Sequence, residues 1–98
     1  MDHAPKISVV MSVYNGSNFL VQSIQAILDQ TFQDFEFIII DDASTDGTPD
    51  IIKSFADKDS RIRAFRNEKN IGPAGFIKNL NTGCREAKGK YIARIDHD

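Results

Sequence analysis

The feature that most constrains this fold is an alternation of strand-like and helical segments along the whole chain. Extended runs rich in β-branched residues, at Lys6–Val13, Phe35–Asp41, Ile62–Arg66 and Tyr91–Ile95, predict four strands. Alternation with helices favours parallel strands joined by right-handed crossovers, and hence a three-layer α/β sandwich with a mainly parallel sheet. The first run is nearly continuous in apolar character, as a strand buried on both faces is. From the alternation and the polar residues at the strand ends we expect the strand order 3-2-1-4, with the first strand central.

Three helices are expected from the spacing of apolar residues and from signals at the helix ends. Ser17 is the expected N-cap of the first helix, and Thr48 followed by Pro49 is expected to open the second. Pro73 is expected to open the third, and Gly89 to follow it. The side chains expected to face the sheet are Leu20, Ile24, Ile27 and Leu28 in the first helix, Ile51, Ile52 and Phe55 in the second, and Phe76, Ile77, Leu80, Cys84 and Ala87 in the third.

Composition narrows the function classes. The 98 residues, 41% hydrophobic and 27% charged, suit one small globular domain. Scattered basic residues and a net charge of −2 do not favour nucleic acid as a partner. The apolar runs are far shorter than the roughly 18–20 residues of a membrane span, and no secretory signal is recognisable. A single cysteine, Cys84, suits a reducing compartment, so we expect a cytoplasmic location, including the cytoplasmic face of the membrane.

Polar clusters stand at the carboxyl ends of three predicted strands. They are Tyr14-Asn15 after the first strand, Asp41-Asp42 at the end of the second, and Asp96-His97-Asp98 after the fourth. In doubly wound sheets, ligands bind beyond the carboxyl ends of the strands, at the point where the strand order reverses. We therefore expect the three clusters to form one site.

Asp96 and Asp98 are candidate metal ligands. They are separated by one residue after a buried strand, and their oxygen atoms suit Mg²⁺ or Mn²⁺. Two carboxylates leave coordination positions for a diphosphate, whose charge as a leaving group the cation would stabilise. Two aspartates at a loop entrance are equally common as solvated residues, so the pattern alone leaves both interpretations open. Neither a Gly-x-Gly-x-x-Gly nor a P-loop motif is present, so diphosphate binding would depend on a metal.

Asp41, Asp42 and Tyr14 are candidates for reading a nucleotide. A carboxylate beside an aromatic ring can bind a base or ribose edge, with Tyr14 as the platform. The simpler interpretation is that the acids cap the next turn and that the tyrosine lies at the edge of the core. Adjacent carboxylates repel each other, so we expect at least one of them to have a hydrogen-bonding partner.

Other charged residues have simpler expected roles. Arg61, Arg63 and Arg66 alternate along or beside the third strand, which predicts solvated charges at a sheet edge. Lys69 and Lys78 flank a predicted turn, where they would be able to face a phosphate. A phosphoacceptor domain is excluded, because it needs an acid pair after the first strand and another aspartate after the third.

Five segments, in order, resemble the amino-terminal half of family 2 glycosyltransferases. They are Ile7–Asn15, Ser23–Phe32, Phe35–Thr48, Asn70–Gly72 and Gly89–Asp98. The resemblance covers nearly the whole chain and implies a GT-A fold with a Rossmann-like nucleotide-binding half. It also implies a nucleotide-diphosphate sugar donor, commonly a UDP- or dTDP-sugar, and Mg²⁺ or Mn²⁺ at the Asp-x-Asp motif. The implied reaction is transfer with inversion to a saccharide or lipid-linked acceptor, as in polysaccharide biosynthesis.

The resemblance assigns roles by position. Asp42, with Asp41, matches the acid that contacts the base, and Asp96 matches the acid near the ribose or metal. The stretch from Asn70 to Gly83 is about one helical turn longer than the commonest form, so no donor contact is assigned to Lys78. The positions assigned to the nucleotide sugar are Ser12, Tyr14, Asn15, Asp41, Asp42 and Asp96, and those assigned to the metal are Asp96 and Asp98.

The family pattern continues past Asp98 into an acceptor-binding half. An inverting transferase needs a general base to deprotonate the acceptor hydroxyl, and that base is expected beyond Asp98. We interpret residues 1–98 as a single donor-binding subdomain that is inactive alone. The alternative is a non-catalytic nucleotide-binding or interaction module with the same fold. Further sequence carrying an acceptor domain would favour the enzyme.

Overall fold

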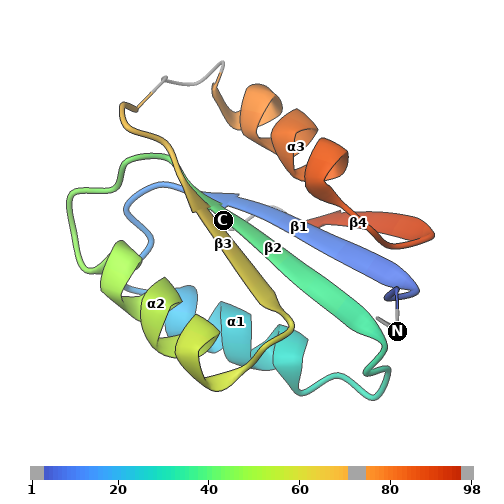
Figure 1. Cartoon of the computed structure of the whole chain (residues 1–98). Helices are drawn as coiled ribbons and strands as arrows, with labels where there is room; N and C mark the ends of the chain where they lie inside the picture. The colour runs from blue at the N-terminus through green and yellow to red at the C-terminus, as the bar shows by residue number, and fades with distance from the viewer. Residues whose placement is uncertain (1–3, 71–74, 96–98) are drawn as a thin grey trace.

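The computed structural model describes residues 4–70 and 75–95, and within them strands and helices alternate as the sequence predicts. Figure 1 shows the central sheet with its helices. The elements are β1 (Ile7–Val13), α1 (Leu20–Leu28), β2 (Phe35–Asp41), α2 (Thr48–Lys58), β3 (Ile62–Arg66), α3 (Gly75–Glu86) and β4 (Tyr91–Ile95).

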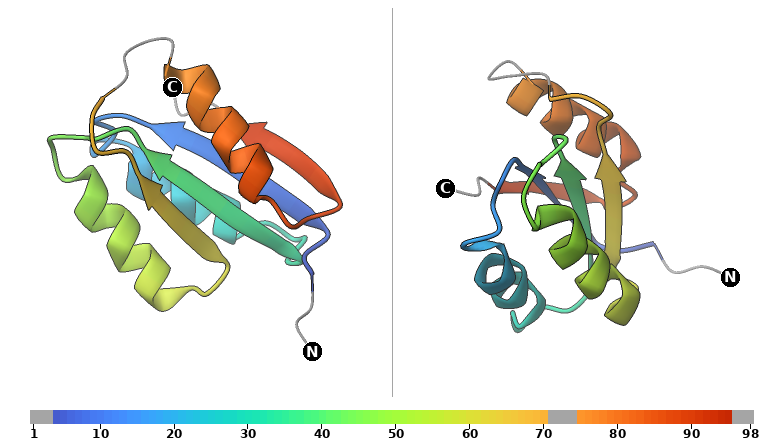
Figure 2. Two further views of the ribbon diagram at one scale, coloured as in Figure 1. Left: turned by 45° about the horizontal axis from the view of Figure 1, so that its top comes forward. Right: turned by 90° about the vertical axis from the view of Figure 1, so that its left-hand side faces the viewer.

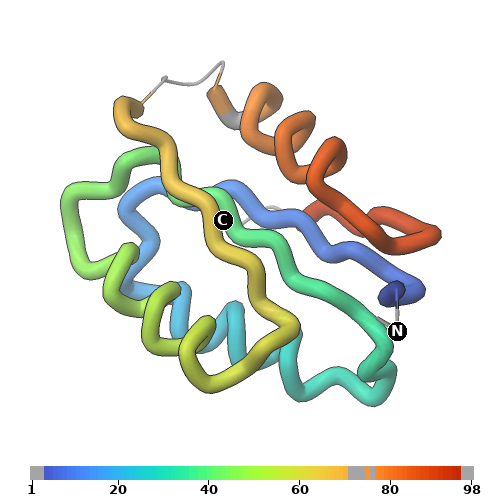
Figure 3. Tube along the Cα trace, in the orientation of Figure 1, coloured from blue at the N-terminus to red at the C-terminus, as the bar shows by residue number. Residues whose placement is uncertain are grey.

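The sheet is parallel throughout, in the order β3-β2-β1-β4, which confirms the predicted strand order. β1, β2 and β3 finish level with one another, because Val13 pairs with Asp41 and Asp41 pairs with Arg66. β4 ends at Ile95, which pairs with Met11. The trace in Figure 3 shows that the loops after β1, β2 and β3 leave the same end of the sheet. Side chains far apart in the sequence therefore meet at this carboxyl edge.

Helices cover both faces of the sheet, with α1 and α2 on one face and α3 on the other (Figure 2). β1 and β2 are buried on both faces, so the side chains of each strand supply two separate core clusters. The larger cluster, under α1 and α2, includes Met11, Leu20, Ile24, Phe37 and Ile39, and the smaller, under α3, contains Val10, Ile38, Ile40 and Leu80.

None of the helices among the described residues is long and apolar enough to cross a membrane.

The first two helices do not begin at the expected caps. α1 starts at Leu20 after Phe19, because the carbonyl of Gly16 accepts the N–H groups of Phe19 and Leu20, at 3.1 and 2.9 Å, in a turn before the helix. Thr48 is the first residue of α2 instead of its cap, and its hydroxyl accepts the N–H of Gly16 at 2.9 Å. Both predicted N-caps, Ser17 and Thr48, were therefore wrong: tertiary contacts between the two loops replace local capping. Pro73 lies outside the described residues.

The buried face of α3 is also rotated from the expected one. Ile77 is 64% exposed, Cys84 is half-buried, and Asn79 is only 2% exposed. A Cβ atom at Gly83 would collide with the side chain of Val10, so the glycine allows the helix to lie close against β1. The stripe through Asn79 and Gly83 consequently faces the sheet, and Ile77 turns to solvent.

β4 is the least buried strand of the described sheet. Its neighbouring residues Tyr91 and Ile92 are 54% and 45% exposed, although the strand pairs with β1 along its length. Ile95 packs against the larger core cluster. β4 therefore adds backbone pairing to β1 and brings the chain to the carboxyl edge, while most of its side chains stay outside the core.

Candidate functional site

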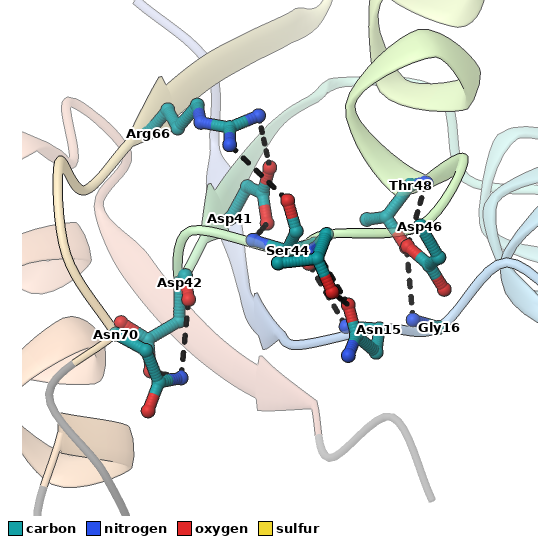
Figure 4. Close-up of polar contacts among 10 residues, drawn as sticks. Asn15, Gly16, Asp41, Asp42, Ser44, Asp46, Thr48, Arg66 and Asn70 are labelled. Carbon is teal, nitrogen blue, oxygen red and sulfur yellow. Dashed lines mark hydrogen bonds and ion pairs between the residues drawn. The ribbon is translucent and has the colours of Figure 1, made fainter.

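Asp41 closes the turn that follows β2. Its carboxylate is buried, with Oδ1 accepting the N–H of Ser44 at 3.0 Å and Oδ2 lying 3.4 Å from Nη1 of Arg66. The Arg66 guanidinium also donates to the carbonyl of Ser44 at 3.1 Å. Figure 4 shows this group on the α2 side of the β2 end. Asp41 therefore acts as a brace for the loop.

Asp42 faces the loop that follows β3. Its side chain is buried, and Oδ1 accepts from the amide of Asn67 at 2.8 Å, while Oδ2 accepts from the amide of Asn70 at 2.9 Å. Its backbone N–H donates to the carbonyl of Val13 at 2.9 Å, which joins the ends of β2 and β1. Both adjacent acids thus have hydrogen-bonding partners, as the expected repulsion requires. The Asp42 carboxylate is an oriented acceptor at the edge where three strands finish.

The loop after β1 is fixed by Asn15. This residue adopts the left-handed φ of 51°, donates its N–H to Oγ of Ser44 at 2.8 Å, and accepts the N–H of Thr45 on Oδ1 at 2.8 Å. Tyr14 beside it is 43% exposed. Asn15 therefore links the loop after β1 to the loop after β2, and the ring of Tyr14 stays accessible to solvent.

A second brace joins the same two loops. Oδ2 of Asp46 accepts the N–H of Ser17 at 3.2 Å, and Oδ1 accepts the N–H of Thr48 at 2.9 Å. Hydrogen bonds from Thr48, first through its side chain and then through its backbone, and from Ser17 hold the pKa of Asp46 well below its usual range. A Cβ atom at Gly16 would come within 2.7 Å of the side chain of Val13 and 3.0 Å of that of Phe19, so the tight turn between β1 and α1 requires glycine there. Hydrogen bonds thus join the loops after β1 and β2 into one wall of the candidate site, made of residues 14–17 and 43–48.

Ser12 lies below this wall and faces α3. It is 3% exposed, and its Oγ accepts from Nδ2 of Asn79 at 3.1 Å. Oδ1 of Asn79 accepts from Nδ2 of Asn67 at 2.8 Å, the same amide that donates to Asp42. Asn67 and Asn79 were not among the predicted site residues. The signal for Asn79 was a polar residue next to Leu80 in a helix that was expected to present an apolar face to the sheet.

The predicted metal ligands Asp96 and Asp98 lie outside the described residues, as does His97. β4 carries the chain to the carboxyl edge as far as Ile95. Among residues 4–70 and 75–95, no group of three or more His, Cys, Asp or Glu side chains is placed to hold a metal ion. The Asp-x-Asp metal site therefore stays a prediction.

Arg61, just before β3, and Arg63 within it are partly buried in ion pairs and are not solvated edge charges, contrary to expectation, whereas the Arg66 side chain is 51% exposed, as expected of an edge charge. Nη2 of Arg61 lies 2.8 Å from Asp59, and Nη1 of Arg63 lies 2.9 Å from Glu36, a carboxylate that is only 7% exposed. Arg66 reaches Asp41 in the same manner. Acids in and beside β2 and β3 attract the guanidinium groups, because a buried carboxylate needs donors in place of water.

Lys69 and Lys78 lie on the outer side of the Asn67–Asn79 link. Together with those two amides, with Glu68 and with Thr82 they line an open pocket of about 350 Å³. The two lysines are exposed, and the pocket adjoins the residue that orients Asp42. This placement is compatible with the expectation that they face an anion.

A parallel sheet with its polar side chains gathered at the carboxyl ends of β1, β2 and β3 defines a Rossmann-like α/β domain, a fold in which ligands generally bind at that edge. The family model for glycosyl transferase family 2 matches residues 8–98, and the chain belongs to this family.

Relatives in sequence carry the same family name. An uncharacterized glycosyltransferase of Rickettsia bellii is 45% identical over 93 residues, which cover 95% of this chain and 13% of that protein. The glycosyltransferase GlyG of Streptococcus pneumoniae is 42% identical over 92 residues, covering 94% of this chain and 30% of GlyG. The chain thus spans less than a third of the length of these curated relatives.

Solved structures share the GT-A fold. Staphylococcus aureus TarS, residues 1–349 in complex with UDP-GlcNAc, matches with a TM-score of 0.85 and 28% identity over 95% of this chain and 26% of TarS. The mannosyltransferase PcManGT of Pyrobaculum calidifontis, in complex with GDP-Man and Mn²⁺, matches with a TM-score of 0.83 and 26% identity over 98% of this chain and 28% of that one.

Proposed function

We propose that this chain supplies the donor-nucleotide site of an inverting, metal-dependent glycosyltransferase. The observation that carries the proposal is the Asp42 carboxylate, held by Asn67 and Asn70 at the edge where β1, β2 and β3 end. Tyr14 leaves β1 immediately after Val13, whose carbonyl binds the backbone of Asp42. The complexes of TarS with UDP-GlcNAc and of PcManGT with GDP-Man support a nucleotide-sugar ligand.

The chemistry of these side chains favours particular bases. A carboxylate accepts hydrogen bonds only, so Asp42 pairs with a base that presents a ring N–H, as uracil, thymine and guanine do. The exposed ring of Tyr14 would stack on the face of the base, an interaction that contributes roughly 1–3 kcal/mol in single-stranded nucleic acid binding. UDP- and dTDP-sugars meet both requirements.

In this proposal Asp96 and Asp98 would hold Mg²⁺ or Mn²⁺, and the bound metal would supply positive charge to stabilise the diphosphate leaving group. The protein's own contribution is to orient the nucleotide: Asp42 binds the base edge, Tyr14 covers its face, and the braced loops after β1 and β2 keep both in place. The acceptor in this proposal is a saccharide or a lipid-linked sugar. We assign the general base to no described residue.

Titration of uridine diphosphate into the isotopically labelled protein, followed by amide chemical shifts, tests the nucleotide site. We expect shifts centred on residues 12–15 and 41–44 and an affinity around millimolar, about −4 kcal/mol. Asp42→Asn keeps the shape of the side chain and should weaken binding about tenfold, because it removes a charged acceptor. Asp57→Asn makes the same change at a side chain that is 64% exposed on α2, and should not alter binding. Shifts confined to other regions, or equal affinity for both variants, would contradict the site.

Asp98→Asn tests the metal. Mn²⁺ should broaden the amide signals near the end of β4 in the wild-type protein and leave them sharp in the variant. In an assay of sugar transfer by the whole enzyme, the same variant should lower the rate by orders of magnitude, because the diphosphate loses the stabilising cation. Undiminished, chelator-resistant transfer would show that the acids are only a polar strand end. Nucleotide binding without any transfer by the whole enzyme would favour the non-catalytic module.

A further inference from the structure

Asn79 is a buried polar side chain on α3 that the proposed function does not use. It is 2% exposed and lies on the helix face that packs against β1 and β2, next to the apolar Leu80. Both ends of its amide are bonded, Nδ2 to Oγ of Ser12 at 3.1 Å and Oδ1 to Nδ2 of Asn67 at 2.8 Å. A buried amide costs stability unless it is fully bonded, so an apolar residue would suit a purely structural position here.

The bonds of Asn79 continue to the base-binding candidate. Nδ2 of Asn67 donates one hydrogen to Oδ1 of Asp42 at 2.8 Å and the other to Asn79. The backbone N–H of Asn67 also donates to the carbonyl of Asp41 at 2.9 Å, which fixes this residue at the end of β3. One line of hydrogen bonds, Ser12–Asn79–Asn67–Asp42, therefore joins α3 to the ends of β1, β2 and β3.

The line has only one consistent direction. The Asp42 carboxylate can only accept, so Asn67 must present its NH₂ group to it. Asn79 must then offer its carbonyl oxygen to Asn67, which leaves its own NH₂ group for Ser12. Removing Asn79 leaves the second hydrogen of the Asn67 amide without an acceptor. Asn67 would then be able to turn away from Asp42.

We propose that Asn79 is a positioning residue for the nucleotide: by fixing Asn67 it aims the Asp42 carboxylate at the ring N–H of the base, and so sets the preference for uridine over cytidine. This role rests on the proposed function, and Asn79 itself touches no nucleotide. Uridine presents an N–H at ring position 3, where cytidine presents a bare nitrogen that repels a carboxylate. The quantity under the control of Asn79 is therefore the ratio of the two affinities.

The experiment measures Kd for uridine diphosphate and for cytidine diphosphate by titration calorimetry, together with Tm. The wild-type protein should bind the uridine compound about tenfold more tightly, as one charged hydrogen bond predicts. Asn79→Leu keeps the branching and the number of non-hydrogen atoms of the side chain, removes its hydrogen-bonding groups, and should bring the ratio to about one. Leu80→Ala, at the neighbouring buried position of α3, is the matched control: it should lower Tm and keep the ratio.

A second variant covers the case in which Asn79→Leu does not fold. Asn67→Ala removes the same link from a half-buried loop position and should also bring the ratio to about one. A wild-type ratio in the folded variants, with binding still weakened by Asp42→Asn, would overturn the positioning role and leave the proposed function intact. If the wild-type protein binds no uridine diphosphate, or if Asp42→Asn binds it equally well, the proposed function falls and the role of Asn79 with it.

Discussion

The two faces of the sheet differ in how their buried side chains are stabilised: one face is almost entirely apolar, and the other also contains buried polar groups. Under α1 and α2, β1 and β2 present apolar side chains as far as Ile39, and these pack into the larger core cluster. Under α3, the same strands mix apolar with polar residues: Ser8 and Ser12 flank Val10 on β1, and Glu36 precedes Ile38 and Ile40 on β2. Apolar packing needs mainly the right volume, whereas each buried polar group needs a partner at a fixed place. The α3 face therefore determines where the polar groups at both ends of the strands lie.

Glu36 is a buried polar group on the α3 face that needs several hydrogen-bonding partners at fixed positions. Its carboxylate, at the end of the sheet opposite the candidate site, accepts from Oγ of Ser8 at 2.5 Å, the N–H of Lys88 at 2.6 Å and Arg63 at 2.9 Å. Burial alone raises the pKa of Glu36, but these hydrogen bonds and the charge of Arg63 outweigh it and lower the pKa below its usual value. The cluster ties the chain just before β4 to β1 and β2. Asp42 at the other end is oriented by loop amides instead.

The largest effect should come from the apolar face. Phe37 is fully buried there, and Phe37→Ala should lower the free energy of unfolding by about 3–5 kcal/mol, because it leaves a cavity. Urea denaturation measures this loss. The folded fraction should still show the uridine diphosphate shifts at residues 41–44. A folded variant without these shifts would mean that the two faces do not act separately.

On the α3 face, Glu36→Gln should lower the free energy of unfolding by about 2 kcal/mol at neutral pH, because the bonds to Ser8, Lys88 and Arg63 lose their charged acceptor. Urea midpoints at constant slope measure the change. Glu68→Gln makes the same substitution at an exposed residue and should change stability little. Equal losses of unfolding free energy for the two variants would show that the hydrogen bonds of the buried Glu36 cluster do not stabilise the fold.

The same variant predicts a pH dependence. The pKa of Glu36 is lowered from its ordinary value of 4.5 in the folded protein, so its contribution is complete above pH 4.5 and is lost as the pH falls through the folded value. The difference in unfolding free energy between wild type and Glu36→Gln should therefore shrink below pH 4.5. Denaturation series between pH 7 and pH 3 test this, and a constant difference would contradict it.

The smallest effect is expected at the carboxyl edge, on the α2 side. The Arg66 side chain is 51% exposed and lies 3.4 Å from Asp41, which keeps the N–H of Ser44 as a second partner. Arg66→Ala should lower the free energy of unfolding by about 1 kcal/mol or less, and the loss should shrink further in high salt. If Arg66→Ala lowered the free energy of unfolding as much as Glu36→Gln does, the exposed ion pair of Asp41 would be as important for stability as the buried cluster of Glu36, contrary to this prediction.

Much of this architecture was predictable from local patterns. Nearly continuous apolar character indicated that β1 is buried on both faces, and the alternation of strands and helices, together with the polar strand ends, led to the order β3-β2-β1-β4. That order placed Tyr14 and Asp42 at one edge before any contact was known. The true starts of α1 and α2 and the buried face of α3 were not predictable in this way, because loop-to-loop bonds and the close approach at Gly83 override local preference.

The pairing of the buried polar groups depends on how the chain packs. The bond between Asn79 and Ser12 joins residues 67 positions apart, and the bond from Lys88 to Glu36 spans 52 positions. Residue types and their spacing were enough to show that these positions are polar and that the strands around them are buried. They did not determine the partners, because a side-chain amide or carboxylate bonds whichever complementary group the packed sheet and α3 bring within about 3 Å. From the sequence, Asn79 is therefore indistinguishable from an ordinary helix residue, and its role becomes visible only in the packing of α3 against β1.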